Sequence, residues 1–295
     1  MTSTSLLHGI KIVSLAINTP GPVAAARLAR MGASVTKVEP PAGDPLKRAA
    51  GNWYDSLCKS QSVVSLDLKD PGDRTKLDSL LTAANLLIVS FRPSALRRLG
   101  LDWDTLHRRH PRLCCAGIIG YPAPLEERSG HDLTYLADTG LLSPPVLPPS
   151  LFVDLAGAES CVSLAVALLL SFSRTGEAAC GFVSLYECAQ ELAQPLGAGL
   201  TAPGGVLSGD FPLYSTYCAS DGWIAVAALE PHFASGLVAA LGLVEADRAA
   251  LEKVFRTRTA ASWEAWALER GLPIVEVRSR SAFSRGPLET LGAEL

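Results

Sequence analysis

The chain has 295 residues, of which 48% are hydrophobic and 19% charged, and its formal net charge is −3. This length and apolar content predict a folded protein with a sizeable core and room for two domains, and they exclude a disordered chain. The weakly acidic balance gives no electrostatic reason to expect a nucleic-acid partner.

The cysteines and the apolar runs indicate the cellular compartment in which the protein is expected. The seven cysteines are odd in number, lack the paired spacing of a zinc site and lie mostly in apolar runs. We therefore expect reduced cysteines, no bound metal and a cytoplasmic protein. The N-terminus lacks the features of a signal peptide. The most apolar stretch, residues 162–172, is too short to span a bilayer and predicts a buried helix, so we expect no membrane partner.

The first part of the chain predicts strands that alternate with helices. Apolar strands are expected at residues 11–16, 34–39, 62–68, 85–90 and 113–121. Helices are expected at residues 23–31 and 70–84, and an irregular segment at residues 40–61. This alternation predicts a parallel α/β sheet. The first turn lacks a G-x-G-x-x-G pattern, so a dinucleotide site is not indicated.

Two basic residues lie at the ends of predicted strands. Lys37 lies near the end of the second strand, and Arg92 follows the fourth strand in Phe91-Arg92-Pro93. Open α/β sheets bind ligands at the carboxyl ends of their strands, and arginine suits a phosphate or carboxylate. A solvated loop arginine is an equally good interpretation of Arg92.

The stretch Gly130-His131-Asp132 joins an irregular segment to the start of a predicted helix. Backbone N–H groups at such a junction can stabilise an anion or a developing oxyanion. Asp154 lies just ahead of a second, long apolar helix at residues 156–172. Each aspartate also has a simpler interpretation as a helix cap, and His131 as a surface residue.

The second part of the chain predicts a separate domain. The first part ends with a predicted strand at 181–186 and a predicted helix at 187–196, and a glycine-rich segment follows. After this segment the sequence predicts a hairpin with strands at 214–219 and 223–228. A helical region at 234–270 and a strand at 273–277 complete the prediction. We predict a large α/β domain at residues 1–196, a linker at 197–209, a smaller α+β domain at 210–275 and a C-terminal tail at 276–295 that could return to the large domain.

Local strings over most of the chain resemble the family III CoA-transferase (CaiB/BaiF) superfamily. They include Val35-Thr36-Lys37-Val38-Glu39-Pro40, Phe91-Arg92-Pro93, Gly130-His131-Asp132 and Glu230-Pro231-His232-Phe233. The His-Asp pair, Asp154 and the Glu-Pro-x-Phe string are most similar to the α-methylacyl-CoA racemase branch. The resemblance implies a Rossmann-like large domain, a smaller domain and an interlocked homodimer whose active site lies between the large domain of one subunit and the small domain of the other.

The resemblance also implies roles for individual residues. A racemase needs two bases that flank the α-carbon and titrate near neutral pH, as histidine does and as a buried aspartate can. His131 and Asp154 would be these bases for a 2-methylacyl-CoA-like thioester, and Glu230 of the partner subunit would orient His131. Coenzyme A enters as part of the substrate, with no prosthetic group. We expect Lys37, Arg92, Lys59 and Tyr135 to contact CoA, the first two because they lie at the ends of predicted strands.

Two other functions fit the same residues. In a CoA-transferase, Asp132 would be the nucleophile and would form an acyl-aspartyl anhydride. A non-catalytic acyl-CoA-binding relative is the second alternative, because Tyr121-Pro122-Ala123-Pro124 replaces the superfamily's glycine-rich loop and Lys59-Ser60-Gln61-Ser62 replaces a basic cluster. The joint presence of His131, Asp154 and Glu230 favours the racemase.

Overall fold

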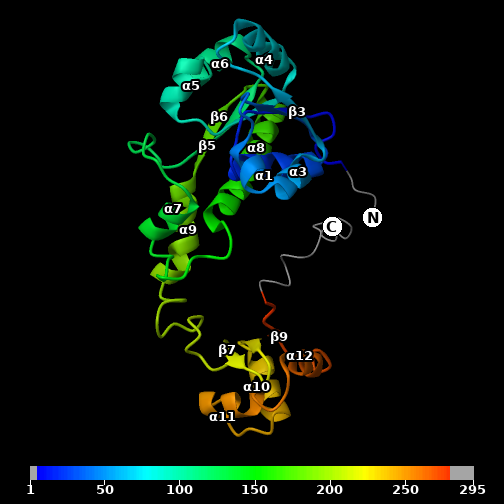
Figure 1. Cartoon of the computed structure of the whole chain (residues 1–295), viewed down its shortest axis with the longest axis vertical. Helices are drawn as coiled ribbons and strands as arrows, with labels where there is room; N and C mark the ends of the chain where they lie inside the picture. The colour runs from blue at the N-terminus through cyan, green and yellow to red at the C-terminus, as the bar shows by residue number, and fades with distance from the viewer. Residues whose placement is uncertain (1–4, 280–295) are drawn as a thin grey trace. The chain divides into compact units, whose positions relative to one another are not determined.

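The computed structural model describes residues 5–279, and the chain divides into two compact units between Ala193 and Gln194 (Figure 1). Each unit has its own sheet and its own hydrophobic core.

The first unit is built on a six-stranded parallel sheet. In spatial order its strands are β3 (Gln61–Ser65), β2 (Ser34–Glu39), β1 (Lys11–Ser14), β4 (Leu86–Val89), β5 (Cys114–Ile119) and β6 (Cys180–Ser184). Every neighbouring pair is parallel, which confirms the predicted parallel α/β sheet. The strand order reverses between β1 and β4, and open α/β sheets bind ligands at such a switch point.

Helices cover both faces of this sheet (Figure 1). The first face carries α1 (Pro20–Arg30), α3 (Gly51–Cys58), α8 (Phe152–Thr175) and α9 (Leu185–Gly197). The second face carries α4 (Pro71–Ala83), α5 (Pro93–Leu99) and α6 (Trp103–Arg109). The strand β4 is buried on both sides, because Leu86 and Ile88 pack in the first core and Leu87 and Val89 in the second.

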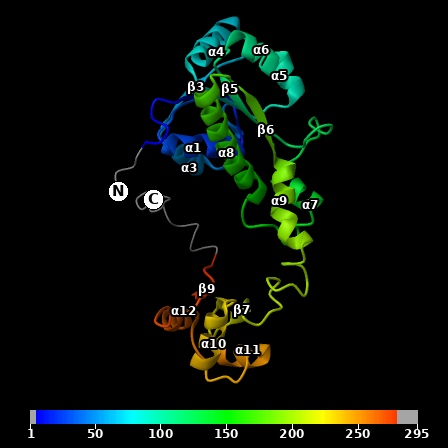
Figure 2. The ribbon, with the colours of Figure 1, turned by 180° about the vertical axis from the view of Figure 1, so that it is seen from behind.

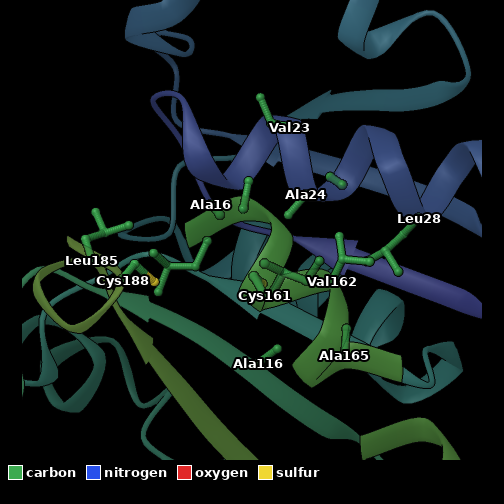
Figure 3. Packing of buried hydrophobic residues seen from close by; sticks show 14 of the residues in the cluster. Ala16, Val23, Ala24, Leu28, Ala116, Cys161, Val162, Ala165, Leu185 and Cys188 are labelled. Atoms are coloured by element: carbon green, nitrogen blue, oxygen red, sulfur yellow. The ribbon is translucent and has the colours of Figure 1, made fainter. Parts of the chain in front are cut away.

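Small side chains allow α1 and α8 to pack closely. Ala24 of α1 and Cys161 and Ala165 of α8 are all 0% exposed and lie in one cluster (Figure 3). Both views of the ribbon place the two helices side by side (Figures 1 and 2). The distance between packed helices depends on the residues at their contact, so this pairing holds the start of α8 close to the end of β1.

The helix α8 is longer than the sequence predicts. It spans 24 residues instead of residues 156–172. Within residues 5–279 it is the one helix that is long and apolar enough, by length and composition, to cross a membrane, so the expectation that its apolar stretch is too short is wrong. In the structure α8 packs on β5 and β6, and 33% of its most apolar 18-residue stretch is buried inside the protein. The absence of a membrane partner stays a prediction.

The expectation of an irregular segment at residues 40–61 is also wrong. Two helices lie there, α2 (Pro45–Ala49) and α3. Pro45 is the first residue of α2, a position where its missing N–H has no cost, and Asp44 caps this helix by accepting the N–H of Leu46 at 2.9 Å. Pro45 therefore marks the start of a helix.

The described part of the second unit, up to residue 279, contains a three-stranded antiparallel sheet and three helices. The strands are β7 (Tyr214–Cys218), β8 (Trp223–Ala227) and β9 (Ile274–Glu276), in that order, and the helices are α10 (Pro231–Ala240), α11 (Arg248–Phe255) and α12 (Ala260–Leu268). The pairing of β7 with β8 confirms the predicted hairpin. In the core, the indole N–H of Trp263 donates to the carbonyl of Phe255 at 2.7 Å. Most of the predicted C-terminal tail lies outside the described residues.

Candidate active site

A pocket of about 330 Å³ opens at the carboxyl ends of β1, β4 and β5. It lies beside the switch point of the sheet. The pocket draws its lining from the loops after these strands and from the starts of α7 (Asp132–Asp138) and α8. Its polar side chains include Asn18, Ser90, Arg92, His131, Tyr135 and Asp154.

Asp132 joins the starts of α7 and α8. Its side chain is 5% exposed, and its Oδ1 accepts the N–H of Val153 at 2.7 Å and the N–H of Asp154 at 3.0 Å. Leu151, the residue before α8, has no side-chain oxygen with which to cap that helix. Asp132 supplies the cap instead, and in doing so it brings its neighbour His131 to the same pocket as Asp154.

His131 is the exposed residue at the start of α7. Its N–H donates to the hydroxyl oxygen of Thr134 at 2.9 Å, and the N–H of Thr134 donates back to the carbonyl of His131 at 2.8 Å. The expectation that residues 130–132 offer free backbone donors is therefore wrong for His131. The N–H of Asp132, in the first turn of the helix, has no intrahelical acceptor.

Asp154 lies in the first turn of α8 and lines the pocket. Burial of the carboxyl group, together with the neighbouring Asp132 carboxylate, raises the pKa of Asp154 to about 6, although a hydrogen bond from Thr19 and the proximity of His131 oppose this rise. A carboxyl group with this pKa is present in both protonation states near neutral pH, as an acid–base catalyst must be.

Gly130 is required by the packing of Tyr135. A Cβ atom at Gly130 would lie 2.5 Å from the ring of Tyr135, which is 1% exposed. Tyr135 lines the pocket, and burial raises its pKa to about 12, so its phenol stays protonated. The glycine before the His-Asp pair thus admits the tyrosine ring beneath the pocket.

Arg92 lies in the loop after β4 and lines the pocket with an exposed side chain. Its Nη2 donates to the hydroxyl of Ser129 at 2.9 Å. Close by, the carboxylate of Glu127 accepts the N–H of Ser94 at 2.9 Å and the hydroxyl of Ser94 at 2.8 Å. These bonds hold the loop before α7 against the start of α5. The guanidinium group suits an anionic ligand, and its contact with CoA stays a prediction.

The prediction that Lys37 contacts CoA is wrong. Its side chain is 0% exposed, and its Nζ lies 2.7 Å from Asp44 and 3.2 Å from Glu39. The same ammonium group donates to the carbonyl of Ala16 at 3.3 Å. Position near a strand end does not reveal which way a side chain points, and here the two carboxylates hold it inside the protein.

Two other predicted residues are absent from the described pocket lining. Lys59 follows α3 and is exposed to solvent. Glu230 is the exposed residue before α10, in the second unit. Their roles stay predictions. In residues 5–279, no group of three or more His, Cys, Asp or Glu side chains is placed to hold a metal ion.

Asn18, Glu126 and Arg128 line the pocket and are not predicted from the sequence. The guanidinium of Arg128 lies 4.3 Å from the ring centroid of Tyr121 and pairs with Asp138 at 3.0 Å. The only sequence signal for these residues is that they follow strands that end at the pocket. Loop residues have no periodicity from which their direction can be predicted.

The family model and the similar proteins point to the same family. The model of CoA-transferase family III matches residues 7–288. Over 257 residues the chain is 32% identical to the alpha-methylacyl-CoA racemase of Homo sapiens, and the match covers 80% of this chain and 65% of the human protein. The Mus musculus racemase is 30% identical over 289 residues, covering 88% of this chain and 74% of that protein. The chain thus spans slightly less than two thirds of the human racemase.

A transferase is similar at a comparable level. The cinnamoyl-CoA:phenyllactate CoA-transferase of Clostridium sporogenes is 31% identical over 188 residues, or 56% of this chain and 46% of that protein.

Solved structures show the same fold. A hypothetical protein from Mycobacterium tuberculosis superposes with a TM-score of 0.82 at 23% identity, covering 97% of this chain and 89% of that chain. A CaiB/BaiF family protein from Brucella suis gives a TM-score of 0.78 at 23% identity, covering 97% and 88%.

Proposed function

We propose that this chain, which belongs to CoA-transferase family III, is a racemase that interconverts the epimers of a 2-methylacyl-CoA-like thioester. The proposal is carried by one observation. His131 and Asp154 line one pocket, whereas Asp132, the candidate nucleophile of a transferase, is buried and caps α8. Racemase relatives at 30% and 32% identity support the same activity.

The proposed reaction transfers protons and inverts the configuration of the α-carbon, and the thioester stays intact. In one direction, neutral His131 removes the α-proton, and the electrons of the C–H bond move into the thioester to form an enolate. Protonated Asp154 then delivers its proton to the opposite face of the α-carbon. The opposite direction uses carboxylate Asp154 as the base and protonated His131 as the acid. The pKa of Asp154, about 6, keeps both of its forms accessible near neutral pH.

Coenzyme A is part of the substrate in this reaction. The exposed guanidinium of Arg92 at the pocket offers a charge partner for a CoA phosphate. The apolar lining, which includes Pro20, Phe91 and Leu185, suits an acyl chain.

Glu230 completes the proposed site from a second copy of the chain. Its carboxylate would accept the ring N–H of His131 that does not face the substrate, which orients the imidazole. Glu230 belongs to the second unit and its side chain is exposed, so it is available for such a contact. This arrangement requires the interlocked homodimer that the family resemblance implies.

A CoA-transferase is the second candidate, because the Clostridium transferase is 31% identical to this chain. In that reaction an oxygen of Asp132 attacks the thioester carbonyl, CoA leaves as a thiolate, and an acyl-aspartyl anhydride forms. The burial of Asp132 and its bonds to α8 argue against this role, because the carboxylate would have to reach a substrate in the pocket.

Chiral analysis separates the two candidates. The protein is incubated with one epimer of 2-methylacyl-CoA and without any acceptor acid, and we expect both epimers to accumulate while total acyl-CoA stays constant. His131→Ala and Asp154→Ala should each abolish racemisation. A hydroxamate formed on Asp132 when hydroxylamine cleaves the anhydride, with the starting epimer unchanged, would support the transferase in place of the racemase.

A further inference from the structure

The racemase reaction needs hydrogen-bond donors for the enolate oxygen. One backbone donor at the start of α7 is occupied, because the N–H of His131 donates to Thr134. The N–H of Asp132 remains, and a polar side chain of the pocket can supply a second donor. Most polar side chains there are engaged. Ser90 accepts the N–H of Ile17, and Arg92 donates to Ser129.

The side chain of Asn18 is not engaged in this way. It lines the pocket at the end of β1, and within residues 5–279 its carboxamide makes no hydrogen bond. A free carboxamide carries two N–H donors and no charge.

The backbone of Asn18 adopts an unfavourable conformation. Its φ is 68°, the only positive φ of a non-glycine residue in the described part of the chain. The left-handed region is costly for L-residues, although asparagine tolerates it better than most. Strained backbone of this kind persists where the surroundings enforce it, and it clusters at functional sites.

A buried ion pair enforces this conformation. Asp44 is 1% exposed, and its Oδ1 accepts the N–H of Asn18 at 3.0 Å. Its Oδ2 pairs with Lys37 at 2.7 Å. Lys37 in turn donates to the carbonyl of Ala16 at 3.3 Å. The pair therefore holds the chain at Ala16 and at Asn18, the residues that flank Ile17. The next residue, Thr19, is 6% exposed and hydrogen-bonds to Asp154. Asn18 is thus held in place next to Thr19, the residue that hydrogen-bonds to the proposed base Asp154.

We propose that Asn18 is a catalytic residue whose carboxamide donates a hydrogen bond to the thioester oxygen as it becomes the enolate, and that Lys37 and Asp44 are the positioning residues that aim it. This inference rests on the proposed racemase function. It explains the choice of residue, because glycine would accept the backbone conformation without a donor, and aspartate would place a negative charge beside the oxyanion. The two donors, Asn18 and the N–H of Asp132, would form the oxyanion hole.

Two variants that keep the backbone conformation test the role of Asn18. Asn18→Gly removes the carboxamide and takes a positive φ without strain. Asn18→Asp keeps the shape but replaces the donors by a charge. For racemisation of a 2-methylacyl-CoA, we expect kcat to fall on the order of a hundredfold in Asn18→Gly and at least as far in Asn18→Asp, with KM nearly unchanged. The thermal midpoint of Asn18→Gly should stay close to that of the parent.

Two other results would contradict either the role of Asn18 or the racemase function. A parent kcat in Asn18→Gly, or a raised KM with an unchanged kcat, would remove Asn18 from the oxyanion hole while the racemase function stands. A parent protein that does not racemise at all would remove the proposed function itself.

The positioning role is tested with Asp44. Asp44→Asn keeps an oxygen that can accept the N–H of Asn18, whereas Asp44→Ala does not, so we expect a larger loss of kcat in Asp44→Ala than in Asp44→Asn. If Asp44→Ala lowers the thermal midpoint but leaves kcat at the parent value, the ion pair is only structural.

Discussion

Asp132 and Asp154 both lie at the start of a helix, but their surroundings differ. The Oδ1 of Asp132 accepts hydrogen bonds from two backbone N–H groups of α8. The carboxyl group of Asp154 lines the pocket, and its pKa is raised to about 6. Neighbouring carboxyl groups in unlike environments commonly divide structural and acid–base roles. Asp132 therefore caps α8, whereas the carboxyl group of Asp154 lines the pocket, where the proposed proton transfer would use it.

The cap can be tested by removing it. Asp132→Ala leaves the first N–H groups of α8 without their acceptor, and we expect it to lower the free energy of unfolding by about 1 to 2 kcal/mol. Asp132→Asn, which keeps an acceptor oxygen, is the matched control and should lose less. Denaturant unfolding measures both. On the racemase account Asp132→Ala keeps measurable racemisation, and its complete loss together with an intact fold would favour the transferase.

The raised pKa of Asp154 predicts a pH-dependent effect on stability. The pKa of about 6 in the folded protein lies above the ordinary value for aspartate, so the folded state binds more protons than the unfolded state between about pH 4 and pH 6. The contribution of Asp154 is therefore fully present below about pH 4 and is lost as the pH rises through 6. We expect the thermal midpoint of Asp154→Asn, relative to the parent, to increase between pH 4.5 and pH 7.5. A difference that stays constant or falls over this range would contradict the raised pKa.

At the scale of elements, the sheet can be predicted from the sequence, whereas most contacts between the loops of the sheet cannot. Buried strands such as β4 are apolar runs, and their ends locate the pocket correctly. The helix α2 is missed because proline signals both a loop and a helix start. The helix α3 is missed because no capping side chain precedes it. The direction of Lys37, the left-handed turn at Asn18 and the bond from Asp132 to α8 all depend on residues distant in the sequence. No local pattern encodes them.

The loop after β4 should contribute charge to CoA binding. Arg92→Ala removes a guanidinium that lines the pocket, and we expect it to weaken the binding of free CoA, more strongly at low salt, where charge contacts are less screened. Arg97→Ala is the control, because Arg97 lies in the last turn of α5 and does not appear in the pocket lining among the described residues. Titration calorimetry at two salt concentrations measures both, and an unchanged dissociation constant in Arg92→Ala would exclude this contact.

At the scale of the whole molecule, the proposed active site requires two chains. His131 and Asp154 belong to the first compact unit and Glu230 to the second. The proposed interlocked homodimer brings Glu230 of one subunit to His131 of the other. If folding and assembly are coupled in this way, the folded monomer is not a stable species. Sedimentation should show a dimer at micromolar concentration, and a compact monomer would count against the shared site.

Mixed dimers test the shared site directly. His131→Ala and Glu230→Ala should each be inactive or nearly so alone. When the two variants are produced together, a mixed dimer has one site with an intact His131 and an intact Glu230, so racemisation should return. If both residues of a site came from the same chain, no mixed dimer would contain an intact site and activity would not recover.

The most direct test of the central claim is deuterium incorporation at the α-carbon. One epimer of a 2-methylacyl-CoA is incubated with the protein in deuterium oxide without an acceptor acid, and both epimers are recovered and analysed by mass spectrometry. Two-base proton transfer predicts one solvent deuterium at the α-carbon of the newly formed epimer, with the thioester intact. A recovered substrate that carries no deuterium and keeps its original configuration would contradict the account.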